Sequence, residues 1–128
     1  MFEARVRASI EAYVAAWNER DATNRMRLIE QACAENLLMR TPGKRVNGRG
    51  ELDALIAAFQ QRCPGQRAVL SSVIEVQGHI FRYTGVIEDS ALAAGGKALD
   101  AGECDEDARI HILLSFVVAS LPARTSAR

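Results

Sequence analysis

The sequence has no excess of charge of either sign. Its 128 residues include 16 lysines and arginines against 16 aspartates and glutamates, so the net charge is zero. Nucleic-acid-binding domains usually carry a basic excess or stripe, and docking on anionic lipid needs clustered basic residues. The basic residues are scattered here, and the three within 44–49 are typical of a solvated turn. We therefore expect neither a nucleic-acid nor a membrane partner.

Cysteine is scarce and shows no pairing pattern. Cys33, Cys63 and Cys104 are odd in number and form no C-x-x-C motif, which suits a reducing compartment better than a disulfide scaffold. The N-terminal MFEAR has charges where a signal peptide needs an apolar run, and no apolar stretch long enough to cross a membrane follows. The sequence therefore predicts a soluble, cytoplasmic protein.

Metal and cofactor motifs are also missing from the sequence. The two histidines have no third ligand at a recognisable spacing, and the thiols are dispersed. No serine lies in a G-x-S-x-G context, and no helix start follows Gly95-Gly96 as a phosphate loop would require. The sequence therefore predicts no metal site and no cofactor.

The first half of the chain has the hydrophobic period of helices. Apolar residues recur every three or four positions over 2–17, which predicts a helix that ends near Asn18 to Arg20. Asp21 predicts the N-cap of a second helix, and Asn36 is its expected stop. A third apolar face over 52–63 predicts another helix, which Pro64-Gly65 terminates.

The rest of the chain has the features of strands and turns. A short apolar run at Leu37–Met39 predicts a buried strand, and Thr41–Lys44 (TPGK) a turn. Beyond residue 66 the period is two, which predicts strands within 68–76, 79–88, 97–104 and 109–120, with turns at 77–78, 95–96 and 105–108. Helices that precede a meander of strands indicate an α+β fold. We expect one domain over 1–121 and a polar tail over 122–128.

The last predicted strand is apolar on both faces. One face carries Ile110, Ile112, Leu114 and Phe116, whereas a sheet with one wet face would alternate more cleanly. Either both faces are covered within the monomer, or one face meets another subunit. Because three helices can cover only one side, we expect a homodimer through the outer sheet face, with Ile112 or Leu114 near the two-fold axis.

Four segments in order resemble the SnoaL-like branch of the nuclear-transport-factor-two-like superfamily, which includes ketosteroid isomerases. They are Tyr13–Asp21 (YVAAWNERD), Gly48–Leu52 (GRGEL), Pro64-Gly65 and Leu99–Ile110 (LDAGECDEDARI), and the resemblance covers about residues 5–118. It implies a cystatin-like cone in which three N-terminal helices pack on a curved antiparallel sheet and enclose a pocket. Because this fold hosts many functions, it implies no single reaction.

Two departures from the family pattern bear on chemistry. Relatives commonly have Asp-Pro after the short strand, and in the isomerases that aspartate is the proton-shuttling base. This chain has Thr41-Pro42, and a threonine hydroxyl is no base near neutral pH, so an isomerase of that mechanism is not expected. Relatives often place a tryptophan about where Gly85 falls, so Gly85 either enlarges the pocket or marks a bulge.

Asp100 is the sharpest candidate for chemistry. The resemblance implies that Asp100 occupies the position of an acid that, in the isomerases, stays protonated in an apolar site. There the acid donates a hydrogen bond to an oxyanion. The mostly apolar stretch 98–101 around it favours burial, and burial raises a carboxyl pKa because it disfavours the charged form. The alternative is a structural acid that pairs with Arg82 or caps backbone groups.

Tyr13 and His111 are the other candidates for catalysis. The resemblance implies that Tyr13 stands where the isomerases have a second oxyanion donor; the alternative is a core tyrosine at the pocket rim. Histidine titrates near neutrality, so His111 is the candidate general base. Strand alternation puts it on the face of Leu113 and Ser115, which the resemblance implies points to the pocket. The expected ligand-binding wall is Trp17, Met39, Phe59, Tyr83 and Leu113.

These features predict a protein with a pocket for a small apolar molecule. If it is catalytic, we expect cofactor-free acid/base chemistry of an isomerase, cyclase or lyase type. The alternative is a non-catalytic binding or dimerisation module whose pocket is filled by its own side chains, and Thr41 in place of a base favours that alternative. Epoxide hydrolases of the superfamily use an arginine between two acids, and Thr84 beside Arg82 weakens that interpretation.

Overall fold

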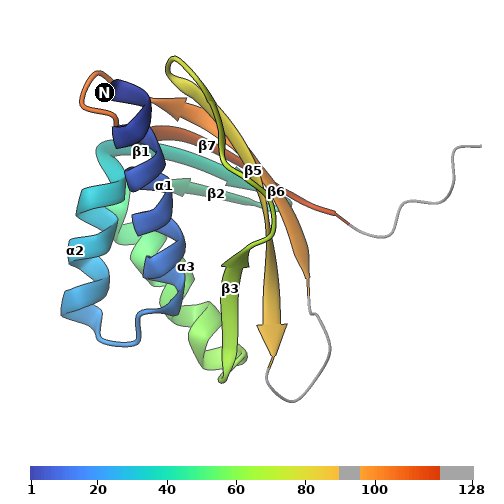
Figure 1. The fold of residues 1–128 in the computed structure, drawn as a ribbon. Coiled ribbons are helices and arrows are strands. Elements are labelled where there is room, and N and C mark those ends of the chain that lie inside the picture. The colour runs from blue at the N-terminus through green and yellow to red at the C-terminus, as the bar shows by residue number, and fades with distance from the viewer. Residues whose placement is uncertain (90–95, 119–128) are drawn as a thin grey trace, which may run out of the picture.

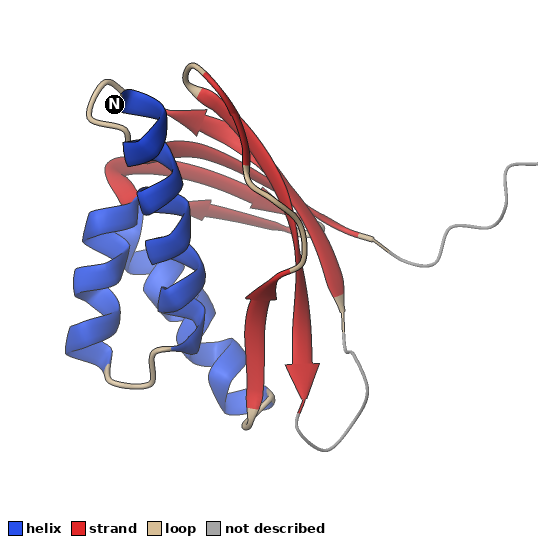
Figure 2. Ribbon diagram, viewed as in Figure 1, coloured by secondary structure: helices blue, strands red, loops and turns tan. Residues whose placement is uncertain are grey.

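Three helices gather on one face of a curved seven-stranded sheet in the computed structural model, which describes residues 1–89 and 96–118 (Figures 1 and 2). The helices are α1 (Phe2–Asn18), α2 (Ala22–Ala32) and α3 (Gly48–Arg62). The strands are β1 (Cys33–Thr41), β2 (Lys44–Asn47), β3 (Gln66–Leu70), β4 (Glu75–Gln77), β5 (Ile80–Asp89), β6 (Lys97–Cys104) and β7 (Ile110–Val117). The predicted tail 122–128 and Gly95 of the predicted Gly95-Gly96 turn lie outside the described residues.

The strand order is β2-β1-β7-β6-β5-β3, and β4 pairs with the other end of β5. This arrangement confirms the predicted α+β cone. One detail was wrong: β1 pairs with β7 in parallel, so the sheet is mixed and not antiparallel throughout. A parallel pair needs a long crossover, and the chain between β1 and β7 supplies it. No helix among the described residues is long and apolar enough to cross a membrane.

The junction between α2 and β1 differs from the prediction. Asp21 does cap α2, since its carboxylate accepts a hydrogen bond from the Asn24 backbone N–H at 2.9 Å. The helix ends at Ala32 and not at Asn36, because Cys33 is already a sheet residue that pairs with Ile110 and is fully buried. Sheet pairing overrides the local stop signal of Asn36 here.

Other boundaries moved by a few residues. The turn at Pro42-Gly43 is confirmed, with Gly43 at a φ of +79°. It joins β1 to β2, a short strand that the sequence analysis missed. The predicted strand over 68–76 is two strands, β3 and β4, that pair with opposite ends of β5. The strands β5, β6 and β7 lie where the period-two pattern predicts them.

The two faces of the sheet follow from the register. Tyr83 pairs with Asp100 and Asp100 pairs with Ser115, so these three residues share the inner face that the helices cover. The helices and this face bury one core, whose largest fully buried side chains are Ile10, Ile29, Leu37, Met39, Leu52, Ile56, Ile110 and Leu113.

The outer face carries most of the apolar stripe expected there. Leu114 is 42% exposed and Phe116 54% exposed, and Leu38 of β1 lies beside Ile112. Ile110 was wrongly assigned to this stripe, because its side chain is fully buried in the core. The cause is a register shift: Cys104 pairs with Ile110 but Glu103 pairs with Ile112, which leaves one extra residue in β7.

A buried polar network ties the three helices together at one end. Arg25 of α2 is 5% exposed, and its Nε lies 2.7 Å from Asp53 Oδ1 of α3. Its Nη1 donates to Gln60 Oε1 at 3.0 Å, and Gln60 donates to the backbone oxygens of Trp17 and Glu19 at 3.0 and 2.9 Å. The network therefore fixes the end of α1, which carries Tyr13 and Trp17, against α2 and α3.

We predict that Arg25→Ala lowers the free energy of unfolding by about 2–3 kcal/mol. Removing one partner of a buried pair typically costs about 3–5 kcal/mol, and Asp53 is partly exposed here. Arg27→Ala is the matched control, since Arg27 is exposed on the same helix. Urea denaturation measures both variants. Equal losses for the two would show that the network does not stabilise the fold.

Candidate functional site

Asp100 and Tyr83 form a hydrogen-bonded pair on the inner face. Tyr83 Oη donates to Asp100 Oδ2 at 2.6 Å, from the neighbouring strand β5 to β6. Tyr83 is 4% exposed and Asp100 is 6% exposed. Tyr13 of α1 is also buried and close enough that its charge and that of Asp100 would repel. The structure therefore brings two of the three predicted catalytic residues into one cluster.

Burial disfavours the charged form of each ionisable group in this cluster. Desolvation raises the pKa of Asp100, while hydrogen bonding by Ser115 and Tyr83 opposes the shift. Desolvation, followed by the nearby Asp100, raises the pKa of Tyr13 well above its usual value. Desolvation, followed by Tyr13 and Asp100, does the same for the pKa of Tyr83. Each group favours its protonated form, as a proton donor would require.

One oxygen of the buried carboxyl has no partner. Asp100 Oδ1 is inaccessible to solvent, and no described residue makes a hydrogen bond of good distance and angle to it. Ser115 of β7, the neighbouring strand on the other side of β6, has its hydroxyl near the same carboxyl. This hydroxyl makes no hydrogen bond of good geometry to Oδ1. A buried polar group left unpaired costs about 1–3 kcal/mol. Among the buried side-chain oxygens and nitrogens of the described residues, this oxygen is the one without a hydrogen-bond partner.

The next level of the inner face is small and accessible. Gly85 and Ala98 face each other across β5 and β6, and Ala98 pairs with Val117, which is 66% exposed. Gly85 lies in a regular ladder, so it marks no bulge. A Cβ at Gly85 would have only the Val69 backbone oxygen within 4 Å. The alternative that Gly85 leaves room beside the cluster therefore stands.

The predicted wall residues divide into two groups. Met39 is 2% exposed and Leu113 is fully buried, so both belong to the hydrophobic core together with Tyr83. Trp17 and Phe59 are half-buried, with their rings packed edge to face at 5.4 Å. Of the five predicted wall residues, Trp17 and Phe59 are the two that combine apolar surface with access from solvent.

His111 lies away from the cluster, and its predicted position was wrong. His111 is the extra residue of the β7 register shift, so the regular alternation of inward and outward side chains is interrupted at this residue. Its side chain lies on the outer face. There His111 Nε2 lies 2.6 Å from Glu103 Oε2. His79 is equally remote, because its Nδ1 contacts the Cys104 backbone oxygen at 2.8 Å. Neither histidine contacts Asp100 or Tyr13.

Arg82 and Thr41 complete the account of the sequence candidates. Arg82 points to the outer face and pairs with Glu75 at 2.7 Å, so it neither neutralises Asp100 nor reaches the interior. Thr41 is half-buried and follows Arg40, which pairs with the outward residue Leu114. Alternation therefore places Thr41 on the inner face, one strand beyond Ser115.

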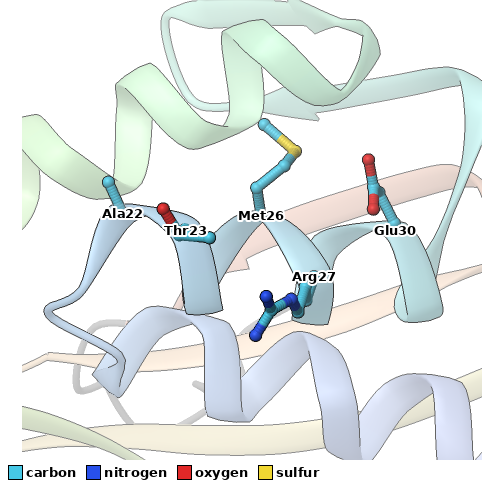
Figure 3. Close-up of a pocket in the computed structure, with 5 residues that line it drawn as sticks. All are labelled: Ala22, Thr23, Met26, Arg27 and Glu30. Atoms are coloured by element: carbon cyan, nitrogen blue, oxygen red, sulfur yellow. The ribbon is translucent and has the colours of Figure 1, made fainter.

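Two surface clefts lie elsewhere. A groove of about 400 Å³ runs along α2, where Figure 3 shows Met26 reaching toward α3. A polar cleft of about 610 Å³ lies at the narrow end of the molecule, between the start of β1, α3 and the turn before β7. Neither is lined by Tyr13 or Asp100. Within the described ranges, no group of three or more His, Cys, Asp or Glu side chains could hold a metal ion.

The buried carboxyl makes folding stability depend on pH. In the unfolded chain Asp100 loses its proton near its ordinary value of 3.8, whereas the folded protein holds the proton to higher pH. The folded state thus binds more protons above pH 3.8, so the contribution of Asp100 is fully present below 3.8 and is lost as pH rises through the folded pKa.

We predict that Asp100→Asn removes this dependence. The free energy of unfolding of the variant, minus that of the wild type, should grow as pH rises above 3.8, by at most about 1.4 kcal/mol per pH unit. Urea denaturation across pH measures it. Asp107→Asn removes an exposed carboxyl from a turn and serves as the control. A difference that stays flat with pH would contradict a raised Asp100 pKa.

Comparison with solved structures identifies the fold. A SnoaL-like isomerase candidate from Agrobacterium tumefaciens is similar at a TM-score of 0.83 and 27% identity, over 91% of this chain and 99% of that one. A nuclear-transport-factor-two-like protein from Burkholderia xenovorans is similar at 0.70 and 16%, over 97% and 91%. An LEH-like epoxide hydrolase from M. tuberculosis is similar at 0.66 and 17%, over 90% and 84%.

No family model matches the sequence, and no curated protein is similar to it beyond chance. The three-dimensional likenesses therefore carry the assignment, and they confirm what the four sequence segments implied. The chain is a member of the SnoaL-like, nuclear-transport-factor-two-like superfamily.

Proposed function

We propose that the protein binds a small, largely apolar molecule on the inner face of its sheet, with Asp100 and Tyr13 as the polar end of the site. The observation that carries this proposal is the unpartnered Asp100 Oδ1, buried directly below the accessible level of Gly85 and Ala98. Binding sites are typically apolar with a few convergent polar groups, and this end of the inner face has that composition.

The surroundings fix what kind of ligand fits. The half-buried rings of Trp17 and Phe59 stand on the helix side, and Ala98 and Val117 on the sheet side are small or apolar. A flat, apolar ligand lying between them would replace water on both of its faces. Such burial stabilises a complex by about 25 cal/mol per Å² of apolar surface.

Any reaction at this site would be acid/base chemistry without a cofactor. The fold is shared with an isomerase candidate and an epoxide hydrolase. Asp100 is the carboxyl of the cluster, and neither histidine contacts it. We infer that Asp100 would both deliver and remove the proton, with Tyr13 as a second donor, in a reaction of isomerase, cyclase or lyase type.

The alternative function is a binding or dimerisation module without catalysis. Thr41 favours it, because a hydroxyl stands at the inner-face position where a base would be expected. The outward position of His111 also favours a module without catalysis, because the site then has no histidine that could act as the general base. Asp100 would in that case hold a ligand by hydrogen bonding alone.

We predict that Ala98→Leu weakens binding of 2-acetylnaphthalene at least about tenfold. The larger side chain would fill the level above Asp100. Trp17 is the only tryptophan of the chain, so quenching of its fluorescence measures binding directly. Ala101→Leu is the matched control, because it makes the same change on the outer face of the same strand. Equal affinities for the two variants would place the ligand elsewhere.

We also propose that the outer face of the sheet forms a homodimer. Leu38, Leu114 and Phe116 are 44%, 42% and 54% exposed, and Ile112 lies between β1 and β6 on the same face. Monomeric proteins seldom expose large contiguous apolar patches, and all three helices lie on the other face. A two-fold pairing would bury the stripe twice.

Leu114→Glu should convert the dimer to a monomer or an aggregate, because it puts a charge into the apolar stripe. Sedimentation at micromolar concentration measures the change. Val73→Glu is the control: Val73 is 79% exposed but lies in the loop between β3 and β4. A wild-type protein that sediments as a monomer at that concentration would rule the dimer out.

A further inference from the structure

The free edge of β3 is covered by side chains from the end of α1 and the loop after it. β3 is the last strand of the sheet, and among the described strands it pairs with β5 alone (Figure 1). Asn18 Nδ2 donates to the Ala68 backbone oxygen at 2.8 Å, and the Ala68 N–H donates to Asn18 Oδ1 at 2.7 Å. One side-chain amide thus bonds to both backbone groups of a strand residue, as a residue of a neighbouring strand would.

These two hydrogen bonds show which residues of β3 face the free edge. In an antiparallel ladder both backbone groups of a residue point to the same side, and the side alternates along the strand. Because the groups of Ala68 point away from β5, those of Gln66 do so too. The Gln66 N–H donates to the Cys63 oxygen at 3.2 Å, and the Gln66 oxygen accepts from Arg20 Nη2 at 3.4 Å. The edge-facing backbone groups of Gln66 and Ala68 are therefore all occupied.

The edge at the other end of the sheet, β2, is protected in a different way. Lys44 and Arg45 are exposed on that strand, and charged side chains on an edge strand oppose pairing with another chain. β3 has a single charged residue, Arg67. This edge has less protection by charge than β2, and hydrogen bonds from side chains take its place.

Contacts with α3 hold Asn18 against β3. Gln60 of α3 donates to the backbone oxygens of Trp17 and Glu19, the residues on either side of Asn18, at 3.0 and 2.9 Å. The Trp17 ring also packs edge to face on Phe59 at 5.4 Å. Asn18 itself is half-buried. The end of α1 is therefore fixed by α3, and its last side chain is directed at the backbone of β3.

We infer that Asn18 is an autoinhibitory cap: its amide occupies a strand-addition site on β3 and keeps β3 of a second copy from pairing there. Without the amide, the Ala68 N–H and oxygen of each copy can bond to those of the other, which joins two sheets about a two-fold axis. In that pairing Ala68 lies opposite Ala68 and Arg67 opposite Val69, so no like charges meet. The inference is independent of the ligand site, and it assigns a role to an asparagine of the segment Tyr13–Asp21 that the ligand site does not use.

The first measurement is amide hydrogen exchange, at a concentration where variant and wild type sediment alike. Exchange of the Ala68 amide should rise about 2- to 13-fold in Asn18→Ala, the range of one net hydrogen bond. The Val69 amide points to β5 and should change less, whereas a general loss of stability would raise both rates equally. Asn24→Ala removes an exposed asparagine from α2 and should change neither rate. An Ala68 rate that is unchanged in Asn18→Ala, or that rises only as much as that of Val69, overturns the cap.

The second measurement is sedimentation over a range of micromolar concentrations. Asn18→Ala should form assemblies larger than those of the wild type, and they should grow with concentration. Adding Ala68→Pro should abolish them, because proline has no N–H to donate and is tolerated on an edge strand. Assemblies that persist in the double variant would place the contact outside β3, and an Asn18→Ala protein that sediments as the wild type at every concentration would show that no second copy pairs; either result overturns the inference. Asn18→Leu lacks both hydrogen-bonding groups at a similar volume, and it decides by the same two measurements if Asn18→Ala does not fold.

Discussion

Burying a carboxyl group in an apolar core costs free energy unless the group is neutral or paired, and the arrangement around Asp100 follows from that constraint. No ion pair of the described residues includes Asp100. Arg82, which the sequence analysis considered as its partner, pairs with Glu75 on the outer face. The core meets the cost with neutral hydroxyl groups. Tyr83 donates from one side and Ser115 lies on the other, while the buried Tyr13 stands opposite on α1. Burial therefore favours a proton on the carboxyl, while hydrogen bonding by Tyr83 and Ser115 opposes that shift of the Asp100 pKa.

Much of this architecture could be predicted from local features. The helical period over 2–17, the Asp21 cap and the period of two beyond residue 66 depend on neighbours in sequence, and they gave α1, the start of α2 and the strands β5 to β7. The end of α2 could not be found in this way. Cys33 pairs with Ile110, seventy-seven positions along the chain, and no local signal encodes that contact. The parallel pairing of β1 with β7 has the same non-local origin.

The candidate site was predictable in part for the same reason. The apolar stretch around Asp100, the helical period around Tyr13 and the family resemblance put both residues in the interior, and both are there. The bond between Tyr83 and Asp100 was not foreseen, because alternation fixes a face but not a register. Which residue of β5 lies opposite Asp100 depends on the connection between the strands. Arg25 was missed as well, since a buried arginine is recognised only from its partners Asp53 and Gln60 on another helix.

The extra residue in β7 decides what each face of the sheet presents. Ile110 packs in the core, and unbroken alternation from it would direct Ile112, Leu114 and Phe116 inward and Leu113 and Ser115 outward. Large apolar side chains would then fill the inner face, and Asp100 would have no hydroxyl beside it on β7. His111 takes up one position in the register shift, so Ile110 and Leu113 both reach the core and Ser115 falls opposite Asp100. The same shift sends Ile112, Leu114 and Phe116 to the outer face. One irregular residue thus makes the inner face polar enough for a hydrogen-bonding site and the outer face apolar enough for association, which explains why both faces of this strand look hydrophobic in the sequence.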